Sequence, residues 1–401
     1  MSHSSRETLG FGIVGLGRAA AATVPAIARN PNTRVVAAAD TNVEVLDAFR
    51  ARYAARGYAS LEDLCNDADV DAVYIATPTH LHTRHVLTAV AAGKHVICEK
   101  PLAITLEDAD QMIAAVEARG VQFIVGQSQS YEPPIRAIRE LVRSGEIGPL
   151  GMISGWYFND WLYRPRLPAE LDTGMGGGVV FRQGAHHFDI ARLIGGGMLR
   201  SVRAAAGVWD AQRPTEGSYS VFLEFESGAA ASLVYSGYDH FFTTELTGGQ
   251  TEGGTRVDPA QQPHAAARRA LATAGDAALK RSVGFAGGVR DQVPAYPAYF
   301  GLLVVSCERG DIRQTPEGLL VYGDSKRWPV PVDTSVSGRD LMIAELYEAV
   351  LHGKAPLHSG RWARATLEVS LAVLESARTR REVVLAHQVP TLDTAEASRD
   401  L

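Results

Sequence analysis

The first residues with a recognisable chemical pattern form a glycine-containing run, Gly15-Leu16-Gly17-Arg18-Ala19-Ala20. In such a run the first glycine permits a tight turn, the second lets the backbone approach a pyrophosphate, and the small last residue lets a helix pack closely on a strand. The free N–H groups at the start of that helix would then hold the anion. The pattern has this meaning only between a strand and a helix, and a purely structural turn is the alternative.

Asp40 adds an acidic residue about 25 positions after Gly15, near the spacing at which a carboxylate accepts hydrogen bonds from ribose hydroxyls. A 2′-phosphate at this place would meet a like charge. We therefore expect NAD rather than NADP, although Arg50 and Arg52 downstream keep NADP open. The alternative for Asp40 is a solvated residue that starts a turn.

Two later segments make the cofactor prediction more specific. The chain reads Ala76-Thr77-Pro78-Thr79-His80-Leu81-His82 and then AGKHVICEKP from residue 92 to residue 101. Together with GLGRAA these segments resemble the Gfo/Idh/MocA family of NAD(P)-dependent oxidoreductases, from about residue 9 to residue 378. The resemblance implies that Thr77, Pro78 and His82 lie at the cofactor, that Glu99 contacts it, and that Lys100 is catalytic beside the nicotinamide.

The residues themselves agree with this role for Lys100. A lysine at the carboxyl end of a parallel strand faces the crevice in which such sheets bind ligands, although a surface lysine before a proline is the alternative. His80, His82 and His85 lack an accompanying acidic ligand or second histidine pair, so we predict no metal.

A second motif, GGGVVFRQGAHHFD over residues 176–189, departs from the family pattern. It retains His186, expected to be catalytic, but Arg182 stands where polyol and sugar dehydrogenases of the family usually carry a catalytic Asp. On an α-helix Arg182 and His186 would share one face. The guanidinium would keep the imidazole neutral and offer a planar fork to a substrate carboxylate. We therefore predict an anionic substrate.

The run WLYRPRLP, which begins at Trp161, adds candidate substrate residues. Arg164 and Arg166 supply cationic groups, and Tyr163 an aromatic ring that could flank a flat substrate. His187 completes the predicted substrate set. A solvated loop is the alternative for the two arginines.

Within the family, three features resemble dehydrogenases of carboxylated cyclic diols: the Arg-for-Asp exchange and the runs SQSYEPPIRAIRELV and YFGLLVVSCERGDIRQTPEGLLVYGD. The implied reaction moves a hydride from a carbinol carbon to the nicotinamide while Lys100 or His186 takes the hydroxyl proton. We favour Lys100 as the proton acceptor and His186 as its partner, but the sequence alone does not decide which residue has which role. Alternatives are a cyclic polyol or sugar acid dehydrogenase, an NAD-using glycosidase, and an NAD-bound regulator without turnover.

These residues need a two-domain α/β framework to position them. Short apolar runs alternate with helical patterns over residues 9–130, which predicts a Rossmann domain with a doubly wound parallel sheet. Residues 131–385 carry longer runs with turn signals and predict an α+β domain with an open, mostly antiparallel sheet. An insertion at about 247–297 is expected to be a lid or an oligomer contact. Residues 1–8 and 386–401 are expected to be tails.

The composition sets the remaining expectations. A net charge of −6 and a pI near 6.1 give no basic footprint for nucleic acid or membrane. No apolar run is long enough to span a bilayer, and Cys65, Cys98 and Cys307 lack a metal or redox spacing. We expect a cytoplasmic protein with a small-molecule substrate, forming a homodimer or homotetramer through the open sheet as the resemblance implies.

Overall fold

The computed structural model describes residues 8–262, 264–280, 283–287, 289 and 293–393, which form two compact units. Unit 1 contains the described residues of Met1–Gly126, Ala278–Gln292 and Arg339–Arg364. Unit 2 contains those of Gln127–Ala277, Val293–Gly338 and Ala365–Leu401. Of the predicted tails 1–8 and 386–401, residues 1–7 and 394–401 lie outside the described residues.

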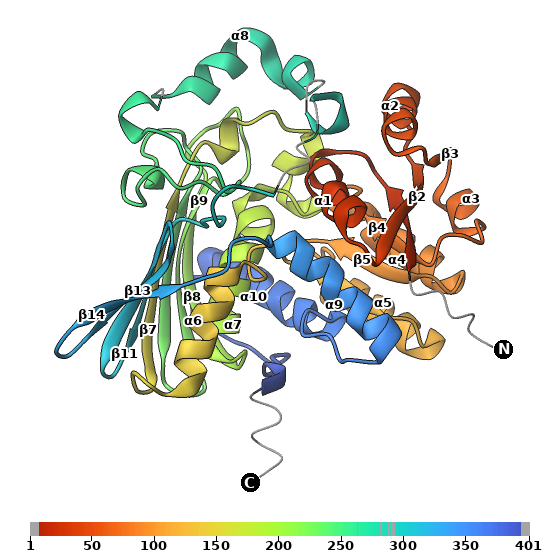
Figure 1. Ribbon diagram of the computed structural model, residues 1–401. Helices are drawn as coiled ribbons and strands as arrows, with labels where there is room; N and C mark the ends of the chain where they lie inside the picture. Colours follow the sequence, from red (N-terminus) through yellow and green to blue (C-terminus); the bar gives the residue numbers. More distant parts are fainter. Residues whose placement is uncertain (1–7, 263, 281–282, 288, 290–292, 394–401) are drawn as a thin grey trace. The chain divides into compact units, whose positions relative to one another are not determined.

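Unit 1 is built around a parallel sheet of strand order β3-β2-β1-β4-β5-β6, drawn in red to orange in Figure 1. The strands are β1 (Leu9–Val14), β2 (Thr33–Ala39), β3 (Arg56–Tyr58), β4 (Ala72–Ile75), β5 (His95–Glu99) and β6 (Phe123–Gly126). Both faces carry helices, so most strand residues are buried. The order reverses between β1 and β4, and ligands of such sheets bind beyond the carboxyl ends of the strands at that point.

The helices of unit 1 follow the predicted strand and helix alternation. They are α1 (Arg18–Arg29), α2 (Val43–Tyr53), α3 (Leu61–Cys65), α4 (His82–Ala91) and α5 (Leu106–Arg119). Ala20 on α1 is fully buried, as expected for the small residue that lets this helix approach the sheet.

Two later segments also belong to unit 1, which corrects the predicted boundary near residue 130. Helix α9 (Gly338–His352) is tied to α1 by an ion pair between Arg29 and Asp340 at 2.6 Å. Ser359 pairs with Ile124 at the end of the sheet. The sequence assigned both segments to the second domain because only tertiary contacts, and no local pattern, connect them to the first.

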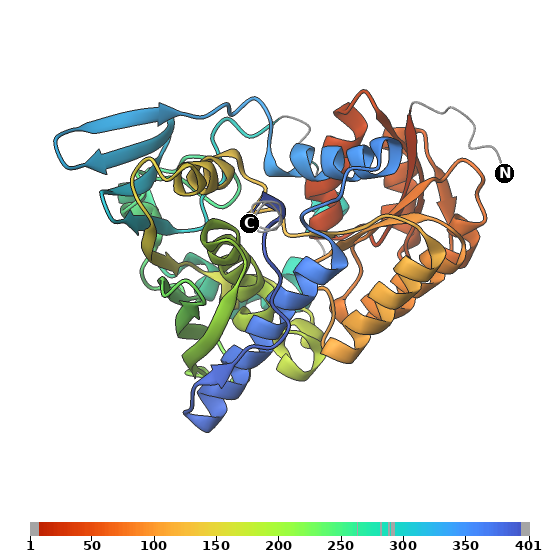
Figure 2. The ribbon, with the colours of Figure 1, turned by 90° about the horizontal axis from the view of Figure 1, so that it is seen from below.

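Unit 2 contains a mixed, mostly antiparallel sheet of strand order β14-β13-β12-β11-β7-β10-β9-β8-β15. Its strands are β7 (Leu150–Phe158), β8 (Leu199–Gly207), β9 (Ser218–Phe225), β10 (Ala230–Ser236), β11 (Leu302–Cys307), β12 (Gly310–Thr315), β13 (Gly318–Gly323), β14 (Arg327–Pro331) and β15 (Val383–Val384). Only β7 and β10 pair in parallel. The hairpin of β13 and β14 extends beyond the rest of this sheet in Figure 2. The predicted fold class is confirmed in both halves.

Helices cover one face of this sheet and leave the other open (Figure 1). They are α6 (Pro133–Ser144), α7 (Ala185–Gly195) and the later part of α10 (Gly360–Thr379). Strand β9 shows the expected alternation, with Val221 and Leu223 buried and Phe222 half exposed.

Residues 386–393, the described part of the predicted tail 386–401, contact α6 and α7. Asp393 forms an ion pair with Arg139 on α6 at 2.7 Å, and Gln388 accepts a hydrogen bond from Arg192 on α7. These polar contacts hold a segment whose composition gave no sign of packing. The insertion contributes α8 (Ala266–Lys280), with a non-helical Gly275 inside it.

Candidate active site

The glycine turn lies between β1 and α1, the context that its pattern requires. Gly15 has a φ of +84°, and the missing side chain of Gly17 faces open space. The N-cap residue of α1 is Gly17, which makes no side-chain capping hydrogen bond. An anionic pyrophosphate fits this arrangement of open glycine and uncapped helix start.

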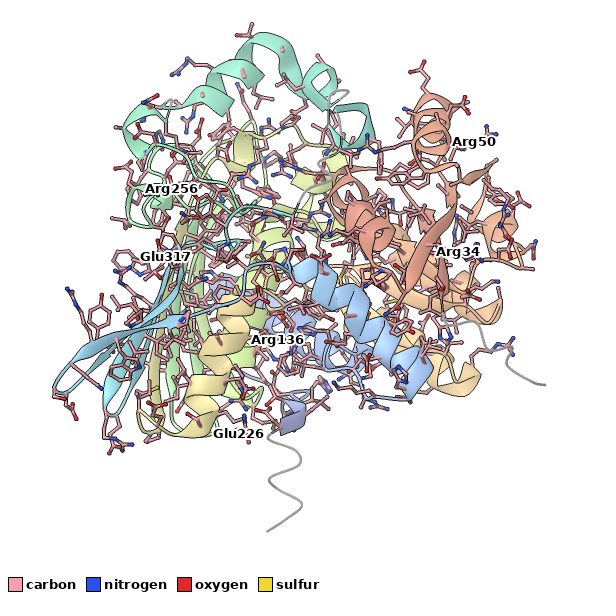
Figure 3. All side chains as sticks on the ribbon, viewed as in Figure 1. Arg34, Arg50, Arg136, Glu226, Arg256 and Glu317 are labelled. Carbon is pink, nitrogen blue, oxygen red and sulfur yellow. The ribbon has the colours of Figure 1, made fainter. Side chains whose placement is uncertain are left out.

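Asp40 is held beside that turn by two backbone donors. Its Oδ2 accepts from the N–H of Leu16 at 2.6 Å, and its Oδ1 accepts from the N–H of Asn42 at 2.8 Å. Each carboxylate oxygen has a second lone pair, so Asp40 retains acceptor capacity for ribose hydroxyls. Arg50, labelled on α2 in Figure 3, pairs with Asp47 at 3.0 Å. This pairing weakens the argument for NADP that the sequence left open.

His82 connects the loops that follow β4 and β5. Its Nε2 lies 2.9 Å from the carbonyl oxygen of Thr77, and its Nδ1 lies 2.9 Å from that of Pro101. Thr77 Oγ1 also lies 2.9 Å from Nδ1 of His85, whose pKa is lowered by burial and by the charge of Arg84. The Thr77-Pro78 loop is thus fixed against the residues that follow Lys100.

Glu99 and Lys100 end strand β5, and the peptide between Lys100 and Pro101 is cis. Glu99 Oε2 accepts from the N–H of Lys100 at 3.2 Å, while Oε1 lies 2.5 Å from the hydroxyl of buried Tyr74. Burial, and then the Glu99 carboxylate, raises the pKa of Tyr74 well above its ordinary value, so this hydroxyl keeps its proton and donates it. The hydrogen bond from Tyr74 therefore orients the Glu99 carboxylate. The sequence analysis did not identify Tyr74 in this role.

In unit 2, Arg182 and His186 do not lie on one regular α-helix as predicted. Residues Val180–Gly184 form a π-helix, and α7 begins only at Ala185. A π-helix has a wider turn than an α-helix, so residues four apart are not on the same face as they are in an α-helix. The prediction that Arg182 and His186 share one face was based on α-helical geometry. Such turns are often found at functional sites.

Arg182 lies near a carboxylate that the sequence argument did not identify. Its Nη2 is 3.4 Å from Oε1 of Glu170, and 26% of its side chain is exposed. Glu170 Oε1 also lies 3.5 Å from Arg166 Nη1, while Oε2 accepts from the N–H of Leu167. Glu170 lies four residues after Arg166, so this pair is close in sequence, but the sequence analysis did not predict it. Its approach to Arg182 depends on folding of the intervening glycine run.

A second carboxylate, Glu216, fixes the start of the π-helix. It accepts from Thr173 Oγ1 at 2.6 Å and from the N–H of Val180 at 3.4 Å. Burial raises the pKa of Glu216 above its ordinary value. No sequence signal connects residue 216 with this helix, because the two come from different loops.

The two adjacent histidines have different surroundings. His186 is buried, and its ring lies 5.4 Å from that of Phe300. His187 is 2% exposed, contacts the Tyr219 hydroxyl through Nδ1 at 3.1 Å and packs over Gly155 of β7. Burial lowers the pKa of His187 to about 3, so this ring is neutral. These contacts favour a core role for His187 over the predicted substrate contact.

The loop with the predicted substrate arginines is held largely by its own residues. Arg166 stacks on Trp161, 3.7 Å from the ring centroid, and donates to the Trp161 carbonyl oxygen at 2.7 Å. Arg164 pairs with Asp160 at 2.7 Å but remains partly exposed. These contacts favour a structural role for Arg166 and leave Arg164 as the candidate for substrate.

The insertion also contacts this loop. Glu252 lies 3.5 Å from Arg164 and accepts from the Tyr157 hydroxyl, while Asp276 of α8 accepts from the N–H of Arg166 at 2.6 Å. The Arg268 guanidinium lies 4.4 Å from the centroid of Tyr163. The insertion therefore supports the candidate substrate loop within unit 2.

Comparison with known proteins supplies the family. Residues 9–127 match an oxidoreductase family with an NAD-binding Rossmann fold, and residues 135–250 match the GFO/IDH/MocA C-terminal domain. A 1-carboxy-3-chloro-3,4-dihydroxycyclohexa-1,5-diene dehydrogenase of Comamonas testosteroni is 36% identical over 376 residues, which cover 92% of this chain and 94% of that protein. The chain belongs to the Gfo/Idh/MocA family. It is an NAD-binding oxidoreductase, as its sequence predicted.

Solved structures of similar proteins agree with the fold. A Bordetella bronchiseptica RB50 protein, provisionally described as a dehydrogenase, has a TM-score of 0.89 and 40% identity, covering 94% of this chain and all of that one. The WlbA dehydrogenase of Bordetella pertussis, solved with NADH and UDP-GlcNAcA, has a TM-score of 0.71 and 21% identity, covering 96% of this chain and 99% of that one. No helix in the described part of this chain is long and apolar enough to cross a membrane.

Proposed function

We propose that this Gfo/Idh/MocA protein oxidises a carboxylated cyclic diol, namely cis-4,5-dihydroxy-4,5-dihydrophthalate, to 4,5-dihydroxyphthalate. The observation that carries the proposal is Arg182, which stands in the place of the usual family Asp and is partly exposed. A guanidinium binds a carboxylate through two parallel hydrogen bonds, which a carboxylate side chain cannot do. The Comamonas testosteroni relative is likewise named for a carboxylated cyclic diol.

Arg182 and Arg164 are the proposed partners of the substrate carboxylates. Both side chains are partly exposed, and each already lies near a protein carboxylate, Glu170 or Asp160. A dicarboxylate would compete with these acids for the guanidinium groups. Tyr163 is the proposed ring neighbour, because its hydroxyl is fixed by Asp210 at 2.8 Å. We leave Arg166 and His187 out of the proposed contacts because of their loop and core roles.

Lys100 is the proposed proton acceptor, and His186 is its proposed partner. Bound NAD supplies the hydride acceptor. Lys100 takes the proton from the substrate hydroxyl as the carbinol carbon is oxidised, and the resulting ring ketone enolises to a catechol. Gain of aromaticity makes this oxidation favourable. The hydrogen bond from the backbone N–H of Lys100 to Glu99 Oε2 fixes the backbone from which the lysine side chain extends, which helps to position it for proton transfer.

The open face of the unit 2 sheet is the proposed contact between copies of the chain. It exposes the apolar side chains Met152, Trp156 and Phe222, of which Trp156 is 51% and Phe222 50% exposed. Apolar residues on an open sheet face favour pairing with a second sheet. We propose a homodimer or homotetramer that works in the cytoplasm, where NAD and free thiols such as Cys65 and Cys98 are maintained.

A substrate screen tests the proposed reaction. NADH formation is measured with the cis-dihydrodiols of phthalate, terephthalate and benzoate, with myo-inositol as the neutral polyol. We expect the highest kcat/KM with the phthalate dihydrodiol and little turnover of the polyol. Activity on myo-inositol alone contradicts the carboxylate proposal, and equal activity on all three dihydrodiols removes the proposed role of a second carboxylate.

A further inference from the structure

The end of the insertion lies against the glycine turn, although more than 250 residues separate them in the sequence. In the short helix η8 (Gly284–Gly287), Gly284 has a φ of +80° and contacts the turn through its backbone. A Cβ added to Gly284 would lie 2.9 Å from the carbonyl carbon of Gly17 and 3.1 Å from the carbonyl oxygen of Leu16. Gly284 therefore needs to be without a side chain at this point of contact.

Phe285 fixes this contact to α2. Its side chain is 8% exposed, and its ring lies 5.2 Å from Phe49 and 6.2 Å from Tyr53 in edge-to-face arrangements. Phe49 and Tyr53 also contact each other, so the three rings form one cluster. Such pairs add stability beyond the apolar area that they bury. The position of Gly284 on the turn is thus anchored by an aromatic side chain.

The segment borders the pyrophosphate site without filling it. The side of Gly17 on which a Cβ would stand has no atom within 4 Å, and Gly17 and Arg18 are exposed. Gly284 instead touches the carbonyl side of Gly17 and Leu16. The face of the turn that accepts an anion therefore stays accessible while η8 is in place.

We propose that Gly284 and Phe285 form a wall of the NAD site that slows dissociation of the dinucleotide. The wall keeps the Leu16-Gly17 turn in the conformation that leaves the side of Gly17 open to the pyrophosphate, and it shields one side of the adenosine and pyrophosphate half from water. The inserted segment is thereby a part of the cofactor site that the Rossmann motif does not include. The inference depends on NAD binding and not on the identity of the substrate.

Binding of NADH to the full-length protein tests the wall directly, by titration and by stopped-flow dissociation monitored through nucleotide fluorescence. Phe285→Ala removes the anchor, and Gly284→Ala places a methyl group against Gly17. We expect each variant to raise the Kd of NADH about threefold to tenfold, chiefly through a faster dissociation rate. Phe285→Leu, which keeps apolar contact with α2, should fall between Phe285→Ala and the parent protein.

Phe241→Ala is the matched control, because Phe241 is an exposed phenylalanine of unit 2 that packs on Phe158. It should leave the Kd of NADH unchanged. An unchanged Kd in both wall variants overturns the proposal, and so does a lower Kd, which would make the segment a plug that NAD displaces. Since no diol is present in the titration, failure of the proposed substrate leaves this result unaffected.

Discussion

The N–H of Leu16 donates to Asp40 Oδ2 across 2.6 Å, so the carboxylate at the end of β2 holds the glycine turn that follows β1. Asp40 is therefore fixed by the same turn beside which it is expected to receive the ribose. Oδ2 accepts from Leu16 and Oδ1 accepts from Asn42, and each oxygen keeps a second lone pair with which it can accept from a ligand. Loss of this side chain affects both the shape of the turn and the recognition of the ribose.

The first prediction concerns Asp40→Ala. The KM for NAD should rise about tenfold to a hundredfold, because hydrogen bonds to a charged acceptor are lost. The KM for NADP should rise less, since removal of the carboxylate also removes its repulsion of the 2′-phosphate. Initial rates with both cofactors measure the ratio. Glu140→Gln, at an exposed acid of α6 that pairs with Arg143, is the control and should change neither KM.

The second prediction concerns Lys100→Met. Turnover should fall on the order of a hundredfold to ten-thousandfold, the range typical of lost proton-transfer catalysis, while the Kd of NADH stays near that of the parent. Stopped-flow rates and NADH titration separate the two quantities. Lys326→Met, at an exposed lysine beside β14, is the matched control. Retained turnover in Lys100→Met would transfer the role of base to His186.

The Rossmann half could be predicted in detail because its signals are local. Each strand of unit 1 is a short apolar run, each helix follows at once, and Asp40 lies at the end of the second long strand. In contrast, β12 has the largely polar sequence GDIRQT, and the parallel pairing of β7 with β10 depends on contacts far apart in sequence. Those features are decided by tertiary packing and not by local pattern.

In the candidate site, too, some residues could be predicted from local sequence and others depend on tertiary contacts. Gly15, Asp40 and Lys100 fall at strand ends, so their type and position predicted their surroundings. Arg166 could not be separated from Arg164 by sequence, because stacking on Trp161 decides between them. Glu170 and Gly284 meet their partners only after the chain has folded back. The sequence shows that a loop arginine carries a positive charge, but only the folded structure shows which carboxylate lies beside it.

The third prediction compares two arginines. Arg182→Gln should raise the KM for a carboxylated dihydrodiol about tenfold to a hundredfold through loss of a charged hydrogen-bond donor, with a smaller change for a neutral dihydrodiol. Arg166→Gln should instead lower the Tm, because it removes the stack on Trp161 and two hydrogen bonds to its carbonyl oxygen. Steady-state kinetics and thermal melts of both variants distinguish the roles. An equal loss on charged and neutral diols in Arg182→Gln contradicts a carboxylate contact.

The last prediction uses the buried imidazole of His187. Burial lowers its pKa from 6.5 to about 3. At a pH between these two values the imidazole is protonated in the unfolded chain but neutral in the folded protein. Unfolding free energy therefore falls as the pH drops below about 6.5 and stops falling for this reason near pH 3. In His187→Gln this contribution is absent, while the side chain can still accept from the Tyr219 hydroxyl.

Thermal melts at a series of pH values measure this difference. His187→Gln should melt below the parent protein at neutral pH, because it disturbs a tight contact with Gly155. The gap between the two Tm values should narrow as the pH falls, because only the parent loses the His187 contribution. His352→Gln, at an exposed histidine of α9, should give a curve parallel to that of the parent. The Tm difference between His187→Gln and the parent could instead stay constant down to acid pH. That result would contradict the core role of His187, because it would mean that the folded protein binds a proton at His187 as readily as the unfolded chain does.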